Sequence, residues 1–302
     1  MAQCSKFFVV FFSLLGFLIF LLRLGFQNLP SGELEVTLLD VGQGDAILIR
    51  TPQNQKILVD AGPVAKVLLP LGRELNYLER DLDLVVLTHP DADHIAGLTE
   101  VLRRYKVGAI LLTGVYHDTV WYADILEQIQ QREIPVLIAN EKVDFDFGAG
   151  VMLDTIWPRE VVAGKKPQNA NQLSIVLRLT FGPTAVLLTG DLDQASEKVL
   201  LQTPQNLRAQ ILKLGHHGSK TSSRADFLAA VGSDVALVSA GPDNRFGHPA
   251  PEVLERVKEQ VVLNTAEEGS IQFRSDSRVW RRVDLSRWGY SAISLTTEKQ
   301  RK

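Results

Sequence analysis

An apolar run that ends in a cluster of metal-binding side chains constrains this chain most. Residues 84–87 are Leu and Val, and Pro90 cannot continue a central strand, so the run predicts a strand that stops near residue 89. A strand-to-helix loop lies at the carboxyl edge of an α/β sheet, where such folds bind ligands. The side chains in this loop are two imidazoles and two carboxylates: His89, Asp91, Asp93 and His94. Mixed nitrogen and oxygen donors suit zinc, manganese or iron, so we expect a metal site rather than a capped polar loop.

The other histidines repeat this placement. Asp191, the pair His216 and His217, and His248 each come after another apolar run, and of the six histidines His117 alone follows no predicted strand. Histidines scattered through a core or a surface rarely show such regularity. We therefore expect these loops to meet at one edge of the fold and to form one site.

The remaining composition is that of an ordinary globular protein. The chain has 302 residues, of which 45% are apolar and 22% charged, and its net charge of −3 implies no general attraction to nucleic acid. Eight Lys and Arg against three Asp and Glu follow from Arg274 onward, which we interpret as a solvated terminus. Cys4 is the single cysteine, which excludes an intramolecular disulfide and a cysteine-based zinc site.

An apolar segment at the N-terminus predicts a membrane anchor. Residues 7–22 carry no charge and are flanked by Lys6 and Arg23. As a helix this segment is about 24 Å long, and extending it to Phe26 reaches the roughly 30 Å of a bilayer core. No small-residue cleavage site follows, so we favour an uncleaved single-pass anchor over a cleaved signal peptide. We expect an anchor and linker over residues 1–30, and a domain over residues 31–302 that lies outside the cytoplasm.

The element pattern predicts an α/β fold in two halves. Three strands joined by short turns open the domain as an antiparallel meander, and helices and strands alternate after it. Two half-sheets flanked by helices indicate an αβ/βα sandwich that counts as one domain. The expected strands are 34–41, 46–50, 56–62, 83–89, 109–112, 135–138, 151–157, 174–180, 185–189, 211–214, 235–240, 261–264 and 270–274; the expected helices are 66–78, 95–104, 121–132, 194–201 and 251–260.

The motifs resemble a known family. Residues 89–94, His-Pro-Asp-Ala-Asp-His, resemble the His-x-His-x-Asp-His signature of metallo-β-lactamase-fold hydrolases. The sequences at 39–46 and 58–62 resemble the opening of that fold. Those at 187–191, 213–219 and 246–249 resemble the metallo-β-lactamase-like domain of ComEC-type competence proteins, which are membrane proteins of bacterial DNA uptake. The resemblance covers residues 34–275 and implies an αββα fold, two divalent metal ions and a hydrolytic, nucleolytic activity.

The resemblance also implies roles for the site residues. Asp191 would bridge two ions, His89 and Asp91 would hold one of them, and Asp93 and His94 the other. One of His216 and His217, preferably His217, would complete a shell. His248 would protonate the leaving oxygen or serve as a late ligand, and Asp93 and His248 are thus the expected catalytic residues. Asp60 and Lys213 are expected to support the site.

Two departures from the family pattern affect the metal. Asp91 stands where most of the superfamily has a second histidine, and this harder ligand favours manganese over zinc. The histidine that commonly follows later, before the second-half strands, is missing, and Asn169 or Asn171 is the nearest oxygen donor in that interval. The first metal site is therefore expected to be weak.

These features favour a membrane-anchored, Mn- or Zn-dependent hydrolase of phosphodiesters, with nucleic acid as substrate and competence-machinery proteins as partners. Lys220, Arg224 and Arg245 flank the site and would hold phosphate. Two alternatives stay open: hydrolysis of a small ester, lactone or lactam, and a non-catalytic partner in a DNA-uptake assembly.

Overall fold

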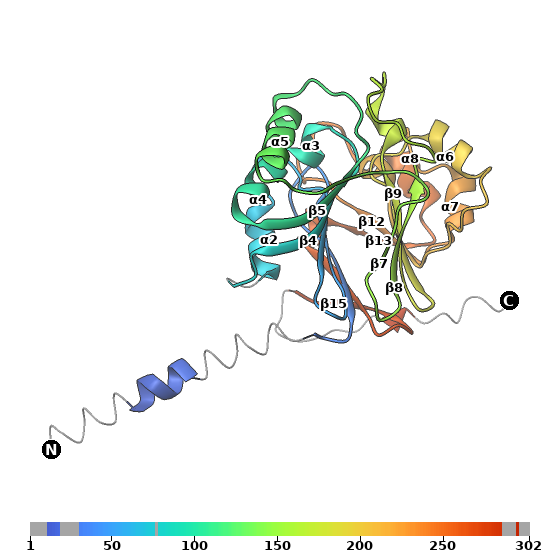
Figure 1. The fold of residues 1–302 in the computed structure, drawn as a ribbon. Coiled ribbons are helices and arrows are strands. Elements are labelled where there is room, and N and C mark those ends of the chain that lie inside the picture. The colour runs from blue at the N-terminus through green and yellow to red at the C-terminus, as the bar shows by residue number, and fades with distance from the viewer. Residues whose placement is uncertain (1–10, 19–29, 76–77, 286–293, 296–302) are drawn as a thin grey trace, which may run out of the picture.

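The structure, a computed structural model, describes residues 11–18, 30–75, 78–285 and 294–295. Two β-sheets face one another in the middle of the fold, and helices cover their outer faces (Figure 1). This is the sandwich that the alternating pattern predicts.

The first sheet contains nine strands within the described residues, and its centre is the opening meander. β1 pairs antiparallel with β2, and β2 with β3, as predicted, and β3 to β6 continue in parallel. In spatial order the strands are β16 (Ser294–Leu295), β15 (Trp280–Val283), β14 (Ile271–Ser275), β1 (Leu34–Leu38), β2 (Ile47–Arg50), β3 (Lys56–Val59), β4 (Asp81–Leu87), β5 (Lys106–Leu112) and β6 (Val136–Ile138).

In the described part of the chain the second sheet contains seven strands, of which β10 to β13 are parallel. In spatial order they are β13 (Val261–Asn264), β12 (Val235–Val238), β11 (Ile211–Lys213), β10 (Thr184–Leu188), β9 (Val176–Phe181), β8 (Val151–Trp157) and β7 (Asp144–Asp146). Near-continuous apolar runs form these parallel strands because both faces of each sheet are covered.

Strand β4 illustrates how that burial works. Leu84 and Val86 point into the core between the two sheets, whereas Val85 and Leu87 point into the core beneath the helices. All four side chains are at most 2% exposed, so the period-two alternation of a strand places apolar groups on two cores at once. The strand is therefore held firmly up to the residue before the metal-binding loop.

Helices cover each sheet on its outer face (Figure 1). Those beside the first sheet are α2 (Leu68–Glu74), α3 (Ala92–Ile95), α4 (Leu98–Arg104) and α5 (Val120–Gln131). Those beside the second are α6 (Gln194–Leu200), α7 (Ala225–Val231) and α8 (Pro251–Arg256). Short elements complete the described chain: α9 (Thr265–Glu268) and the 3₁₀ turns η1 (Ala170–Leu173) and η2 (Gly215–Gly218).

The structure corrects several predicted boundaries. The helix predicted over 66–78 is shorter, and the one over 95–104 is divided at Gly97 into α3 and α4. α3 begins at Ala92, so Asp93 and His94 lie on a helical turn and not in the loop expected for them. Asp91 immediately precedes that turn. Strands β7, β15 and β16 and helices α7 and α9 were not predicted. The strands and α9 are only two to four residues long, whereas α7 buries Phe227, Leu228 and Val231 at helical spacing, a pattern that the prediction did not use.

The predicted anchor lies largely outside the described residues. Residues 11–18 are helical and exposed, and the rest of segment 7–22 is not described. Among the residues that the structure describes, no helix combines the length and apolarity needed to cross a membrane. The domain boundary at residue 31 stays a prediction; β1 begins at Leu34 and pairs with β14.

Candidate metal centre

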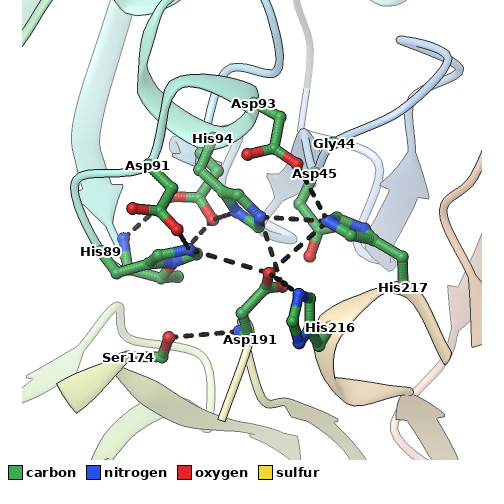
Figure 2. Close-up of polar contacts among 12 residues, drawn as sticks. Gly44, Asp45, His89, Asp91, Asp93, His94, Ser174, Asp191, His216 and His217 are labelled. Atoms are coloured by element: carbon green, nitrogen blue, oxygen red, sulfur yellow. Dashed lines mark hydrogen bonds and ion pairs between the residues drawn. The ribbon is translucent and has the colours of Figure 1, made fainter. Parts of the chain in front are cut away.

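The carboxylate of Asp191 lies at the centre of the histidine cluster (Figure 2). It follows β10, is 2% exposed, and its backbone N–H donates to Ser174 Oγ at 3.2 Å. Four imidazoles direct Nε2 toward its oxygens: His94 at 3.3 Å, His217 at 3.6 Å, His216 at 3.7 Å and His89 at 3.8 Å. The loops after β4, β10 and β11 thus meet at one edge, as predicted.

One group of donors lies on the side of Asp191 nearest α3. His94 Nε2 and His217 Nε2 are 3.3 Å apart, and Asp93 Oδ2 lies 3.4 Å from His217 Nε2. Ligands roughly 2.1 Å from one tetrahedral ion are roughly 3.4 Å from each other. The spacing therefore fits three side chains that, with Asp191, share a divalent ion.

A second group lies around His89. Its Nε2 is 3.6 Å from Asp91 Oδ2 and 3.8 Å from Asp191 Oδ2. Asp91 is partly exposed, whereas His89 is 1% exposed. The two groups share Asp191, so this carboxylate is placed where a ligand common to two ions would be.

Hydrogen bonds leave the Nε2 lone pairs available. Thr88 Oγ1 donates to Asp60 Oδ2 at 2.7 Å, so it accepts from His89 Nδ1 at 2.9 Å. Asp60 Oδ2 also accepts from His94 Nδ1 at 2.7 Å. With their protons on Nδ1, both rings present an unprotonated Nε2 toward Asp191.

His217 is supported in a similar way. Its Nδ1 faces Asp45 Oδ1 at 3.3 Å, and the other oxygen of Asp45 accepts from the buried Lys213 ammonium at 2.7 Å. A carboxylate behind a histidine commonly fixes the orientation of a metal ligand. Asp45 also lies within 4.8 Å of the ligand atoms of His94, Asp191 and His217, but its geometry gives it the supporting position.

The buried atoms at the centre test whether a metal fits. His89 Nε2 and Asp191 Oδ1 are buried and have no hydrogen-bond partner among the described residues. Leaving such groups unpaired costs free energy unless an unseen ligand satisfies them. The donor set of imidazole nitrogen and carboxylate oxygen is one that divalent transition metals accept. The residues present therefore fit a metal centre.

The charges around the centre also favour a cation. Burial lowers the pKa of His89 to about 3, helped by the charge on His94, so this ring is neutral. Burial would lower the pKa of His217 too, but the carboxylates of Asp191 and Asp45 outweigh it and raise this pKa to about 9. Asp191 has a pKa well below its ordinary value because His217 and His94 outweigh its burial. The ionised carboxylates thus call for positive charge at the centre, which protons on His94 and His217 or a bound divalent cation can supply; a cation displaces these protons and leaves Nε2 free to bind it.

Glycine allows two loops to approach the site. Gly44 has a φ of 118°, and a Cβ at this position would lie 2.0 Å from the carbonyl oxygen of Asp93. Its carbonyl accepts from Ser239 Oγ at 2.6 Å. A larger residue would push the loop of Asp45 away from α3, and with it the support behind His217.

Sequence reasoning missed contacts of three residues. In the sequence analysis, Asp45 appears only in a family-like motif. Its position in the turn just before β2 could have indicated a residue at the site. His117 was set aside, yet its Nε2 lies 3.8 Å from Asp91 Oδ1. His216 was ranked below His217, yet both reach Asp191.

The asparagines considered as oxygen donors occupy other positions. Asn169 Oδ1 accepts from the N–H of Asn171 and caps η1, and Asn169 Nδ2 donates to Asp193 Oδ2 at 3.4 Å. Asn171 Nδ2 lies 3.4 Å from His216 Nδ1. The contact places Asn171 behind a histidine.

His248 lies beside the cluster. Its ring centroid is 5.6 Å from that of His216 and 6.4 Å from that of His217. Burial and the charges of His216 and His217 lower its pKa, and its Nδ1 is buried without a hydrogen-bond partner in the described part of the chain. A neutral imidazole with a free nitrogen is thus available at the site.

The three predicted phosphate-binding residues differ in their surroundings. The guanidinium of Arg224 forms two contacts with Asp226, at 2.9 and 2.8 Å. That of Arg245 lies 5.0 Å from the ring centroid of Phe246. Lys220 is exposed in the loop after η2.

Comparison with known proteins agrees with this geometry. The family profile described as Metallo-beta-lactamase superfamily matches residues 39–241. The chain is 28% identical over 270 residues to ComE operon protein 3 of Bacillus subtilis (strain 168), covering 82% of this chain and 34% of that protein. It is 36% identical over 252 residues to competence protein ComA of Neisseria gonorrhoeae, covering 82% of this chain and 33% of that protein. The chain thus spans about a third of the length of these curated relatives.

Among solved structures, the metallo-beta-lactamase fold protein YhfI from Bacillus subtilis has a TM-score of 0.52 at 16% identity, covering 80% of this chain and 99% of that protein. This likeness concerns the fold alone. Together with the family profile and the donor cluster at the sheet edge, it confirms the resemblance found in the motifs. The chain belongs to the metallo-beta-lactamase superfamily, whose fold is that of metal-dependent hydrolases.

Proposed function

We propose that this protein is a metal-dependent phosphodiesterase that cleaves DNA in a competence-related process. The observation that carries the proposal is the convergence of two donor groups on Asp191 beside a loop that presents a guanidinium and an aromatic ring. The competence proteins among its relatives support the same process.

The chain's residues divide the work as follows. His89, Asp91, Asp93, His94, Asp191 and His217 would hold two divalent ions. When bound, such ions supply Lewis acidity toward water and toward the oxygens of a phosphodiester. His248, neutral and beside the cluster, would move a proton at the leaving oxygen. Asp93, whose Oδ2 lies 3.4 Å from His217 Nε2, would hold the same ion as His217.

The loop after β12 favours a nucleic-acid substrate. Phe246 is 54% exposed, and its ring stacks on that of His248 at a centroid distance of 5.7 Å and an angle of 22°. Arg245 covers Phe246 as described above. Nucleobases stack on exposed aromatic rings and guanidinium groups, whereas binding of a small ester requires no such stacking surface.

This loop is held in a defined shape. Asn244 Nδ2 donates to the carbonyls of Gly241 and His248, both at 2.8 Å, and its Oδ1 accepts from the N–H of His248 at 2.8 Å. The stack of Arg245, Phe246 and His248 is therefore presented in one arrangement, which lowers the entropy cost of binding a base.

The test compares substrates. The full chain, purified in detergent, is incubated with labelled single- and double-stranded DNA, bis-p-nitrophenyl phosphate and a p-nitrophenyl ester, with Mn²⁺, Zn²⁺ or Mg²⁺. We expect metal-dependent cleavage of DNA and of the diester. Cleavage of the ester alone would favour the small-substrate alternative, and no cleavage with bound metal would favour a non-catalytic partner.

Variants at Lys220 and Arg245 distinguish an effect on DNA binding from an effect on the metal centre. In a variant with Lys220→Ala and Arg245→Ala, we expect DNA affinity to fall for all sequences, and the salt slope to decrease by about one per lost phosphate contact. Hydrolysis of the small diester should change little. A double variant at two exposed lysines, Lys198→Ala with Lys258→Ala, is the charge-matched control. Equal losses on both substrates would indicate a damaged metal centre instead.

We also propose that the N-terminal segment anchors the protein in a membrane. The uncharged run of residues 7–22 supports a single-pass anchor with the hydrolase domain outside the cytoplasm. The full chain should sediment with membranes, deletion of residues 1–30 should release it, and external protease should cleave it in spheroplasts. A full chain found wholly in the supernatant would refute the anchor.

A further inference from the structure

We propose that His216 is a ligand of the first metal ion, with His89, Asp91 and Asp191, and so replaces the histidine that is missing between His94 and Asp191. The inference rests on the metal centre of the proposed function, but its test reads metal binding and not DNA cleavage. With His216 as a ligand, the first metal site, which the sequence predicts to be weak, has four ligands.

Backbone conformation directs His216 and His217 to the same carboxylate. Both have positive φ values, 51° and 55°, which are rare for residues other than glycine. In an extended strand two consecutive side chains point to opposite faces. Here both Nε2 atoms reach Asp191 Oδ2, at 3.7 Å from His216 and 3.6 Å from His217.

The turn that holds this conformation is bonded to its surroundings. The N–H of His216 donates to the carbonyl of Gly190, directly before Asp191, at 3.2 Å, and the N–H of Ser219 donates to the carbonyl of His216 at 2.8 Å. Such left-handed residues cost free energy and persist where the surroundings enforce them, often at functional sites. The strained turn is fastened to the strand end that carries Asp191.

The imidazole of His216 is oriented as a ligand. Thr221 Oγ1 lies 3.2 Å from its Nδ1, and Asn171 Nδ2 lies 3.4 Å from the same nitrogen. The hydroxyl of Thr221 can accept the Nδ1 proton, which leaves the lone pair on Nε2, the atom that faces Asp191. Thr221 thus supports this ring from behind, as Asp60 supports His94, whereas Asn171 Nδ2 is a donor and does not accept the Nδ1 proton.

The donor group around His89 needs such a nitrogen. His89 Nε2 is buried, has no hydrogen-bond partner among the described residues, and points to the oxygen of Asp191 that His216 also faces. Asp91 Oδ2 lies 3.6 Å from it. Separations of 3.6 to 3.8 Å are slightly wider than the roughly 3.4 Å expected around a bound ion, so a small contraction would close the shell.

His117 is the competing candidate and provides the control. Its Nε2 is 3.8 Å from Asp91 Oδ1, but its other described contacts are with Thr119 and the ring of Tyr122. It therefore borders Asp91 from outside, whereas His216 faces the shared carboxylate. Both histidines are partly exposed, so replacing either one removes an imidazole at a similar distance from the core.

The test measures metal content and affinity of the full chain. His216→Asn suits the purpose because asparagine tolerates a positive φ, which alanine does not. After equilibrium dialysis against Mn²⁺, we expect about two ions per wild-type chain and per His117→Asn chain, and about one per His216→Asn chain. Affinity for the lost ion should fall at least tenfold in calorimetry. A spin-coupled manganese signal should give way to that of an isolated ion.

A measurement on the unaltered chain guards against a folding defect in the variant. With Zn²⁺ bound, the ¹⁵N resonances of the His216 ring should move to the metal-bound range and those of His117 should not. Two tightly bound ions in His216→Asn, loss of an ion in His117→Asn, or a wild-type chain that binds one ion would overturn the inference. A chain that binds two ions through His216 but leaves DNA intact would refute the proposed function and uphold the ligand.

Discussion

Asp60 Oδ2 accepts a hydrogen bond from His94 Nδ1 at 2.7 Å, in a place where both residues are fully buried. This bond fixes the proton on Nδ1 and leaves Nε2 for a metal ion. In Asp60→Asn an amide N–H placed against His94 would favour the proton on Nε2, where it blocks coordination. We expect a 10- to 100-fold loss of metal affinity, roughly, with the fold retained. Calorimetric titration with Mn²⁺ measures the loss, and unchanged affinity would contradict this role.

Lys213 neutralises a buried carboxylate. Its ammonium is 0% exposed and lies 2.7 Å from Asp45 Oδ2. Lys213→Met leaves a buried charge without its partner, so we expect a loss of about 3 to 5 kcal/mol in the free energy of unfolding. Lys220→Met, at an exposed lysine, should change it by less than about 0.5 kcal/mol. Urea unfolding compares the two, and adding Asp45→Asn to Lys213→Met should recover part of the loss.

Glu197 makes stability depend on pH. Its buried carboxylate accepts from the N–H groups of Ser223 and Arg224, but burial outweighs these bonds and raises its pKa from 4.5 to about 7. The folded state therefore binds a proton more tightly than the unfolded state. Its contribution to stability is complete below about pH 4.5 and is lost as the pH rises to about 7.

The variant Glu197→Gln isolates this effect. Between about pH 5 and pH 8, with a chelator present, the wild-type chain should lose up to roughly 3 kcal/mol more than the variant. Glu255→Gln, at an exposed carboxylate, should follow the wild type. Parallel stability profiles for the wild type and Glu197→Gln would contradict the prediction.

The choice of metal follows from Asp91. A carboxylate in place of an imidazole hardens the first site, so we expect higher activity with Mn²⁺ than with Zn²⁺. Asp91→His should shift the preference toward Zn²⁺. The ratio of the two initial rates, measured on the metal-free protein after adding each ion, checks both statements. Activity with zinc alone in the wild type would contradict them.

The sequence was sufficient for the general location of the centre. Parallel strands bury both faces and therefore appear as apolar runs, and the residues after them meet at one edge. This places His89, Asp191 and His217 together without knowledge of the tertiary structure. The family signature at residues 89–94 adds the fold, and the match over residues 39–241 confirms it.

What the sequence could not show depends on backbone conformation and on distant contacts. Positive φ values direct both His216 and His217 to Asp191, and the sequence Gly-His-His-Gly does not predict this conformation. The 2.7 Å contact between Asp45 and Lys213 joins residues 168 positions apart. His117 comes near Asp91 only because β5 lies beside β4.

The basic C-terminal segment shows a similar limit. Its charge suggested a solvated terminus, and the described part is in addition ion-paired: Arg274 contacts Glu35, and Arg281 contacts Glu33 and Asp276. The composition of the segment could not reveal these partners, since two of them lie at the start of the domain.

Loss of DNA hydrolysis in Asp93→Ala tests the central claim most directly. Asp93 lies on α3 with a partly exposed side chain that contacts His217, so its removal affects the centre and little of the core. We expect metal-dependent hydrolysis of labelled DNA to fall at least about a hundredfold, with an unchanged melting temperature. Asp124→Ala, at a partly exposed carboxylate on α5, should retain wild-type activity. Full activity in Asp93→Ala, or no metal-dependent hydrolysis by the wild-type chain, would contradict the account.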